Sequence, residues 1–109
     1  MEGVIRSFVD ERRQLLLNRI EAFCSGQTKF RDLYECGWDI IHDWHKLSIE
    51  KNTPYLPGEV SFWMAVWEVA TTSKYDYEEA KSLVEIKFIN LIQILKEQKC
   101  PEGVISLRP

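Results

Sequence analysis

The segment 59–71 limits most strongly what this chain can fold into. Its sequence, EVSFWMAVWEVAT, places apolar side chains around most of a helical wheel. Only Ser61, Glu68 and the following Thr72 form a narrow polar strip. A helix with so much apolar surface is stable only where neighbouring elements enclose it. We therefore expect this helix at the centre of a bundle.

The same segment carries Phe62, Trp63 and Trp67 within two helical turns. We interpret these rings as the middle of a core, because burying each one stabilises a fold by a few kcal/mol. The alternative is that one tryptophan reaches the surface as an interface anchor, a role for which tryptophan is favoured. Pro57 and Gly58 precede the helix, and Glu59 stands where the helix dipole favours an anion.

Apolar residues at helical spacing predict three further helices. The first helix of the chain covers 3–24 and stops at Ser25-Gly26. The second is capped by Thr28 and ends before Asn52. The last helix starts with a capping box of Asp76 and Glu79 and ends near Lys99. The predicted core faces are Ile5, Phe8, Val9, Leu16, Ile20 and Phe23; Phe30, Leu33, Gly37, Ile40, Ile41 and Trp44; and Ala80, Leu83, Val84, Phe88, Leu91 and Leu95.

The fold class predicted is all-α, a compact bundle of about four helices followed by a short extended tail, CPEGVISLRP. With 109 residues the chain fits one domain, residues 1–109. Ile86 and Ile89 fall on the polar side of the last helix and require a cover. The tail, through Val104, Ile105 and Leu107, is one candidate cover, and a partner or a second copy of the chain is the other.

Composition restricts the partners. A net charge of -3 and a pI near 5.4 argue against direct nucleic-acid binding and favour a basic protein partner. The N-terminal sequence lacks a secretory signal, and no apolar run approaches the roughly 20 residues that cross a bilayer, so we expect a cytoplasmic protein without a membrane role. Cys24, Cys36 and Cys100 form no CxxC pair, and we expect them to be small buried residues in a reducing compartment.

An acidic stripe, Asp32, Glu35, Asp39 and Asp43, recurs at helical spacing in the second helix. Like charges at this spacing destabilise a helix by roughly 0.2–0.5 kcal/mol per pair. Local compensation is available, because Asp32 suits the helix dipole, Arg31 can reach Glu35 and Lys46 can reach Asp43. Asp39 has no such neighbour. The functional interpretation is that the stripe meets a basic partner surface.

Two other sets of polar residues have structural and functional interpretations. Asp39, His42 and His45 lie within two helical turns, but no second histidine-bearing segment completes a metal site, so we expect neither metal nor cofactor. Arg12 and Arg19 fall within the apolar arc of the first helix. We expect them to extend along its edge, or to meet a carboxylate such as that of Glu68 across the bundle.

No catalytic motif is present: the sequence has neither a nucleophile with an orienting base nor a glycine-rich phosphate loop, and we expect no enzyme. With its acidic helix face, the stretch PYLPGEVSFW and the tail SLRP, the chain resembles the helical immunity proteins of contact-dependent growth inhibition and of tRNase-type colicins. The resemblance implies an inhibitor that binds and occludes a cognate nuclease toxin domain. It implies no catalytic chemistry.

Under that hypothesis the partner contacts are Asp32, Glu35, Asp39 and Asp43, with His42 at their margin. Two alternatives stay open. One is a homo-oligomeric helical adaptor or regulatory protein that buries Ile86 and Ile89 against a second copy. The other is a metal-binding helical bundle.

Overall fold

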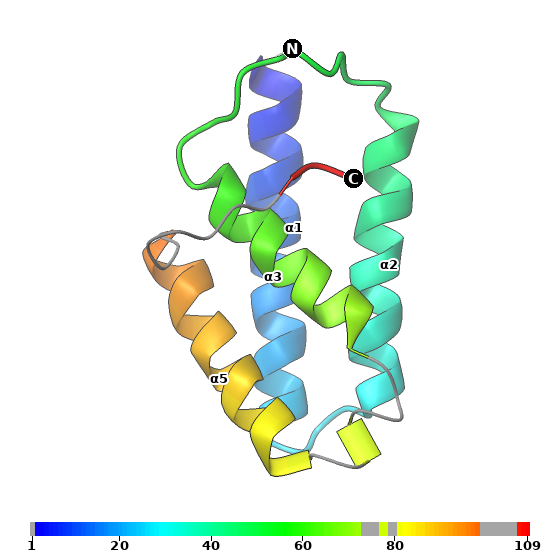
Figure 1. The fold of residues 1–109 in the computed structure, drawn as a ribbon, viewed down its shortest axis with the longest axis vertical. Helices are drawn as coiled ribbons and strands as arrows, with labels where there is room; N and C mark the ends of the chain where they lie inside the picture. Colours follow the sequence, from blue (N-terminus) through cyan, green and yellow to red (C-terminus); the bar gives the residue numbers. More distant parts are fainter. Residues whose placement is uncertain (1, 73–76, 79–80, 99–106) are drawn as a thin grey trace.

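The computed structural model describes residues 2–72, 77–78, 81–98 and 107–109. Over these ranges it is all-helical, as predicted, with the helices α1 (Glu2–Cys24), α2 (Phe30–Lys46), α3 (Glu59–Thr71) and α5 (Lys81–Glu97). In Figure 1, α1, α2 and α5 follow the long axis of the molecule and α3 crosses them obliquely. Several predicted features lie outside the described residues, namely the capping box of Asp76 and Glu79, the core residue Ala80, and Cys100, Val104 and Ile105 of the tail.

Helix α3 occupies the centre, which confirms the prediction from its apolar sequence. Phe62 and Trp63 are fully buried. The Trp63 ring centroid lies 5.0 Å from that of Trp44 in α2 and 6.4 Å from that of Phe8 in α1. These contacts join three helices at one aromatic cluster, which supports the interpretation of the two residues as core. Trp67 is only partly buried.

The polar strip expected on α3 faces solvent only at Glu68, which is partly exposed. Ser61 and Thr72 are buried, with 2% and 5% of their surface exposed. The Ser61 hydroxyl donates to the Gly58 carbonyl at 2.8 Å, and the Thr72 hydroxyl donates to the Glu68 carbonyl at 2.6 Å. Because each hydroxyl bonds to a nearby backbone carbonyl of its own segment, both side chains can be buried without losing a hydrogen bond.

A close approach of α2 and α3 depends on Gly37. A Cβ atom at this position would lie 3.1 Å from Val69 Cγ1 and 3.2 Å from the Ala70 nitrogen. Gly37 is therefore a core residue, as predicted. Glycine is needed here because a larger residue would push the two helices apart.

The predicted ends of α1 and α3 agree with the structure, whereas those of α2 do not. Thr28 does not cap α2. The helix starts at Phe30 with Lys29 as its N-cap, and the Lys29 N–H donates to Asp32 Oδ2 at 3.4 Å. The buried Thr28 hydroxyl has no hydrogen-bond partner among the described residues. At the other end α2 stops at Lys46, earlier than expected, and Ser48 follows with a left-handed φ of 53°.

Helix α5 presents Val84, Phe88, Leu91 and Leu95 to the core, as predicted. Leu83 is the exception, since 70% of its surface is exposed. It lies about 100° around the helix from Val84, so the face that packs on α1 and α3 leaves Leu83 outside. Ile86 and Ile89 are exposed at 56% and 54%, which confirms their place on the outer side.

Candidate functional site

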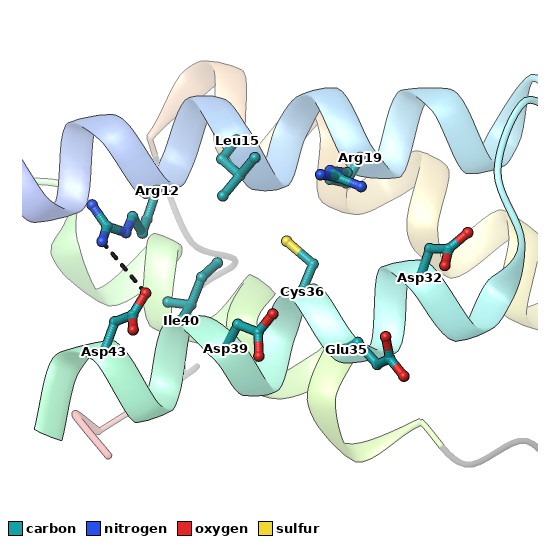
Figure 2. Close-up of a pocket in the computed structure, with 9 residues that line it drawn as sticks. All are labelled: Arg12, Leu15, Arg19, Asp32, Glu35, Cys36, Asp39, Ile40 and Asp43. Carbon is teal, nitrogen blue, oxygen red and sulfur yellow. Dashed lines mark hydrogen bonds and ion pairs between the residues drawn. The ribbon is translucent and has the colours of Figure 1, made fainter.

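The acidic stripe of α2 faces the cleft between α2 and α1. Figure 2 shows the two helices side by side, with Arg12 and Arg19 on α1 and the carboxylates on α2. Together they border a small cavity of about 180 Å³. Its lining comprises Arg12, Leu15, Arg19, Asp32, Glu35, Cys36, Asp39, Ile40 and Asp43. The four predicted acidic residues are therefore brought together, but beside two arginines of α1.

The local pairs expected within α2 are present. Arg31 Nε lies 2.9 Å from Glu35 Oε1, and Lys46 Nζ lies 3.6 Å from Asp43 Oδ1. Both pairs involve exposed side chains, so each contributes little, about 0–1 kcal/mol, to stability. Their geometry shows that part of the stripe is already compensated by its own helix.

Asp39 differs from its neighbours on the stripe. Its side chain is exposed, and within the described ranges it makes neither a hydrogen bond nor an ion pair. It stands one turn from both Glu35 and Asp43, where like charges disfavour the helix by roughly 0.2–0.5 kcal/mol per pair. The carboxylate of Asp39 is thus the one on the stripe whose presence local pairing does not explain.

Arg12 crosses the cleft to α2. Its Nη2 lies 3.4 Å from Asp43 Oδ2, and its guanidinium carbon lies 4.6 Å from the centroid of the Phe8 ring. The expectation of a carboxylate partner is confirmed, but the suggested partner Glu68 is wrong. Glu68 instead pairs with Lys87 of α5. Long-range pairs of this kind depend on how the helices dock, which helical spacing does not specify.

Arg19 and Cys36 face the same cleft from α1 and α2. Arg19 is exposed and has no carboxylate within ion-pair distance among the described residues. Cys36 is buried, and burial raises the pKa of its thiol, with Asp39 adding to the rise and Arg19 opposing it. The thiol is therefore protonated at neutral pH. Cys24 is exposed, contrary to the expectation that it would be buried.

Aromatic side chains border the stripe on its other side. Tyr34, Trp38 and His42 follow each other at four-residue spacing and line, with Glu35 and Asp39, an open cavity of about 480 Å³. The centroids of the Trp38 and His42 rings lie 6.3 Å apart. Sequence analysis missed Tyr34 and Trp38, although their repeat on the same helix as the acids was visible. We call Tyr34, Glu35, Trp38, Asp39 and His42 the α2 outer face.

The aromatic surface extends past the start of α2. Phe30 and Tyr77 stack with ring centroids 4.7 Å apart and an interplanar angle of 1°. They line a second open cavity of about 680 Å³ that also involves Tyr34 and Glu35. The two cavities share these residues, so the aromatic surface continues from the N-terminus of α2 to His42, with the basic Lys29 and Arg31 at its N-terminal end.

The histidines show no metal geometry. His42 and His45 are both exposed. In the part of the chain that the structure describes, no group of three or more histidine, cysteine, aspartate or glutamate side chains is placed to hold a metal ion. His42 instead contacts Trp38 as part of the α2 outer face.

A second charged cluster joins α3 to the C-terminal segment 107–109. Glu59 is fully buried, and its carboxylate pairs with Arg108, with Arg108 Nη2 2.8 Å from Glu59 Oε1. It also accepts hydrogen bonds from the Leu56 N–H and from Trp63 Nε1, both at 3.0 Å. Sequence analysis assigned Glu59 only to the helix dipole and did not identify Arg108.

The surroundings of Glu59 keep it ionised. Burial alone raises the pKa of the Glu59 carboxyl, but the hydrogen bonds from Arg108, Leu56 and Trp63, together with the charge of Arg108, outweigh burial and lower this pKa below its usual range. A signal for this pair was available: Glu59 stands at the start of a mostly apolar helix, where burial would favour a cationic partner, and the tail SLRP carries an arginine.

The C-terminal segment does not cover α5 with Leu107. This side chain is 66% exposed, and the Leu107 carbonyl accepts a hydrogen bond from Trp67 Nε1 at 2.7 Å, on α3. Ile86 lines a cavity of about 370 Å³ between α3 and α5. Of the tail residues expected to cover Ile86 and Ile89, Leu107 therefore contacts a different helix, and Val104 and Ile105 lie outside the described residues.

Comparison with known proteins adds no family. No protein-family model matches the chain, and no curated protein or solved structure shows significant similarity to it. Across the described ranges, each helix is too short or too polar to cross a lipid bilayer. The argument for function therefore depends on the surfaces themselves.

Proposed function

We propose that this protein is an immunity-type inhibitor that binds a basic nuclease domain through the α2 outer face and the adjoining acidic stripe. The observation that carries the proposal is the exposed carboxylate of Asp39, which has no partner among the residues that the structure describes and lines one cavity with Tyr34 and Trp38. The surface needs no catalytic group of its own, because occlusion of the partner's nucleic-acid groove suffices.

The chemistry of this face suits lysine and arginine side chains. Carboxylates oppose a positive potential, speed association and fix the orientation of docking. Aromatic rings add apolar contact and attract guanidinium groups by cation–π interaction, worth about 0.5–1 kcal/mol at exposed sites. A nuclease groove is basic because it holds phosphates. An acidic helix can therefore occupy it in place of the nucleic acid.

We assign the residues of this surface different contacts with the partner. Asp39 and Glu35 supply negative charge, although Glu35 must exchange its contact with Arg31 for a contact with the partner. Trp38 and Tyr34 supply the rigid aromatic contact that is typical of interface hot spots. Asp43 and Asp32 are committed to Arg12 and to the N-terminus of α2, so we assign them a supporting electrostatic role.

Affinity capture tests this proposal. The tagged protein is incubated with lysate of its native organism, and the retained proteins are identified by mass spectrometry. Recovery of a basic nuclease-like domain by the parent, and its loss with Asp39→Lys, is the expected result. Glu97→Lys makes the same charge change on α5, outside the α2 outer face, and serves as the matched control.

The captured domain is then titrated against purified variants. We expect Trp38→Ala to weaken binding about 30-fold, which corresponds to a hot-spot loss of about 2 kcal/mol. Asp39→Lys should weaken it at least tenfold, while Glu97→Lys should leave it unchanged. Equal affinity of all four proteins would remove the α2 outer face from the interface.

A second candidate function, self-association as an adaptor, is favoured by the exposed Leu83, Ile86 and Ile89 of α5. Their exposure gives a second copy an apolar surface to cover. Light scattering over a range of concentrations decides it. A mass that stays at 12.9 kDa, the mass of one chain, would contradict self-association.

A further inference from the structure

Arg108 occupies a site assembled from three separate parts of the chain. Trp44 comes from α2, Thr53 and Tyr55 from the connection between α2 and α3, and Glu59 from the first turn of α3. Figure 1 shows the segment 107–109, in red, running from beside the N-terminal half of α3 toward α2. Although the segment follows the helices in sequence, its one described arginine lies where these three parts meet.

Every nitrogen of the guanidinium has a partner. Nε and Nη2 form a bidentate pair with the two carboxylate oxygens of Glu59. Nη1 donates to the Thr53 carbonyl at 2.7 Å, and Nη2 also donates to the Pro54 carbonyl at 3.1 Å. The flat fork of arginine matches this set of acceptors, whereas the ammonium of lysine is a point charge that cannot bind a carboxylate in this way.

Aromatic rings complete the enclosure. The guanidinium carbon of Arg108 lies 4.2 Å from the centroid of the Tyr55 ring and 5.4 Å from that of Trp44. Only 9% of the Arg108 side chain is exposed. A cation over two aromatic faces and out of water is stabilised more strongly than one at the surface.

The receptor half of the site is held in place by contacts that do not involve Arg108. The Glu59 carboxylate is bonded by the Leu56 N–H and by the indole of Trp63, which is itself in the core. These bonds orient the two carboxylate oxygens from the side of the core, independently of the bonds that Arg108 donates. The acceptors are thus preorganised, which lowers the entropy lost on binding.

We infer that Trp44, Thr53, Pro54, Tyr55 and Glu59 form an arginine-binding site, which holds the segment 107–109 through Arg108 and accepts a free alkylguanidinium when the Arg108 side chain is removed. The site is separate from the α2 outer face, and the inference does not depend on the proposed function. Its consequence is that the C-terminal segment is held mainly by side-chain recognition of an arginine. Two further bonds assist, from Trp67 Nε1 to the Leu107 carbonyl and from the Arg108 backbone N–H to the Tyr55 hydroxyl.

Chemical rescue of the full chain tests the inference. Arg108→Ala removes the part of the side chain that ethylguanidinium resembles. We expect millimolar ethylguanidinium to raise the Tm of Arg108→Ala, measured by helical circular dichroism, by several degrees and to saturate. Ethylammonium at the same concentration should not do so. The parent, whose site is occupied, should show no rise, and neither should Glu59→Gln/Arg108→Ala, which lacks the carboxylate.

The outcomes separate clearly. A saturable rise only in Arg108→Ala supports the site, and if this variant is unfolded on its own, recovery of helical signal with ethylguanidinium supports it equally. No rise or recovery, or an equal effect in the double variant, would overturn it.

Arg108→Lys gives a second test that needs no ligand. We expect its Tm to fall by several degrees despite the conserved charge, and a parental Tm would contradict recognition of the guanidinium fork.

Discussion

Glu59 and Asp39 are both helical carboxylates, yet the fold uses them in opposite ways. Glu59 is fully buried and meets Arg108, Trp63 and the Leu56 N–H, whereas Asp39 is exposed and unpaired among the described residues. A charge removed from water must be fully paired or it destabilises the fold, while a charge in water is nearly neutral for stability. Glu59 therefore stabilises the fold, whereas no contact among the described residues gives Asp39 such a role.

The largest expected effect comes from breaking the buried pair. Glu59→Gln keeps the shape of the side chain but leaves Arg108 without its counter-charge, so we expect a loss of about 3 kcal/mol in the free energy of unfolding. Urea denaturation followed by circular dichroism measures it. In Glu59→Gln/Arg108→Met the loss should be smaller than the sum of the two single losses. Strict additivity would show that the two residues do not act as a pair.

Acidification should weaken the same pair in the parent. Because folding lowers the pKa of Glu59, its contribution to stability is complete above the pKa of the unfolded chain, roughly 4.3, and is lost as the pH falls through the lower folded value. We expect the free energy of unfolding between pH 5 and roughly pH 3 to fall more steeply in the parent than in Glu59→Gln. Parallel pH curves for the two proteins would contradict this assignment.

Sequence reasoning was most accurate where a structural feature depends on nearby residues. The apolar circumference of 59–71 predicted a buried helix, and Gly26, with φ +78°, stands at the helix end predicted from it. Gly58, with φ +81°, precedes the helix start that Pro57 and Glu59 predicted. These features follow from side-chain period and backbone conformation, both of which are local. The all-α architecture could be predicted for the same reason.

Most of the errors concern docking, whereas the wrong cap and the wrong end of α2 are local. Whether Leu83 or Val84 is buried depends on which face of α5 meets α1 and α3, and the partner of Arg12 depends on the angle between α1 and α2. The pair of Glu59 and Arg108 spans 49 residues along the chain. Local periodicity has no access to such contacts. The acidic stripe could be predicted, and so could Asp39 as its carboxylate without a local partner, but the contact of Asp43 with Arg12 on another helix could not.

An intermediate effect is expected at Asp43, which lies between the two extremes. Its side chain is 39% exposed and contacts both Arg12 and Lys46. Asp43→Asn should lower the free energy of unfolding by about 0.5–1 kcal/mol, since partly exposed pairs contribute in this range. The loss should shrink at high salt, which urea denaturation at two salt concentrations can show. A loss as large as that of Glu59→Gln would remove the distinction between buried and cleft carboxylates.

The smallest effect on stability is expected at Asp39. Asp39→Asn removes a charge that repels Glu35 and Asp43 one turn away, and it breaks no pair among the described residues. The free energy of unfolding should therefore stay within about 0.5 kcal/mol of the parent value, and we expect a slight increase. Urea denaturation of the two proteins side by side measures this. A clear loss would mean that Asp39 has a structural role, and its availability to a basic partner would no longer follow from its exposure. A neutral or positive change, combined with weaker binding of that partner, would separate the function of this carboxylate from the stability of the helix that carries it.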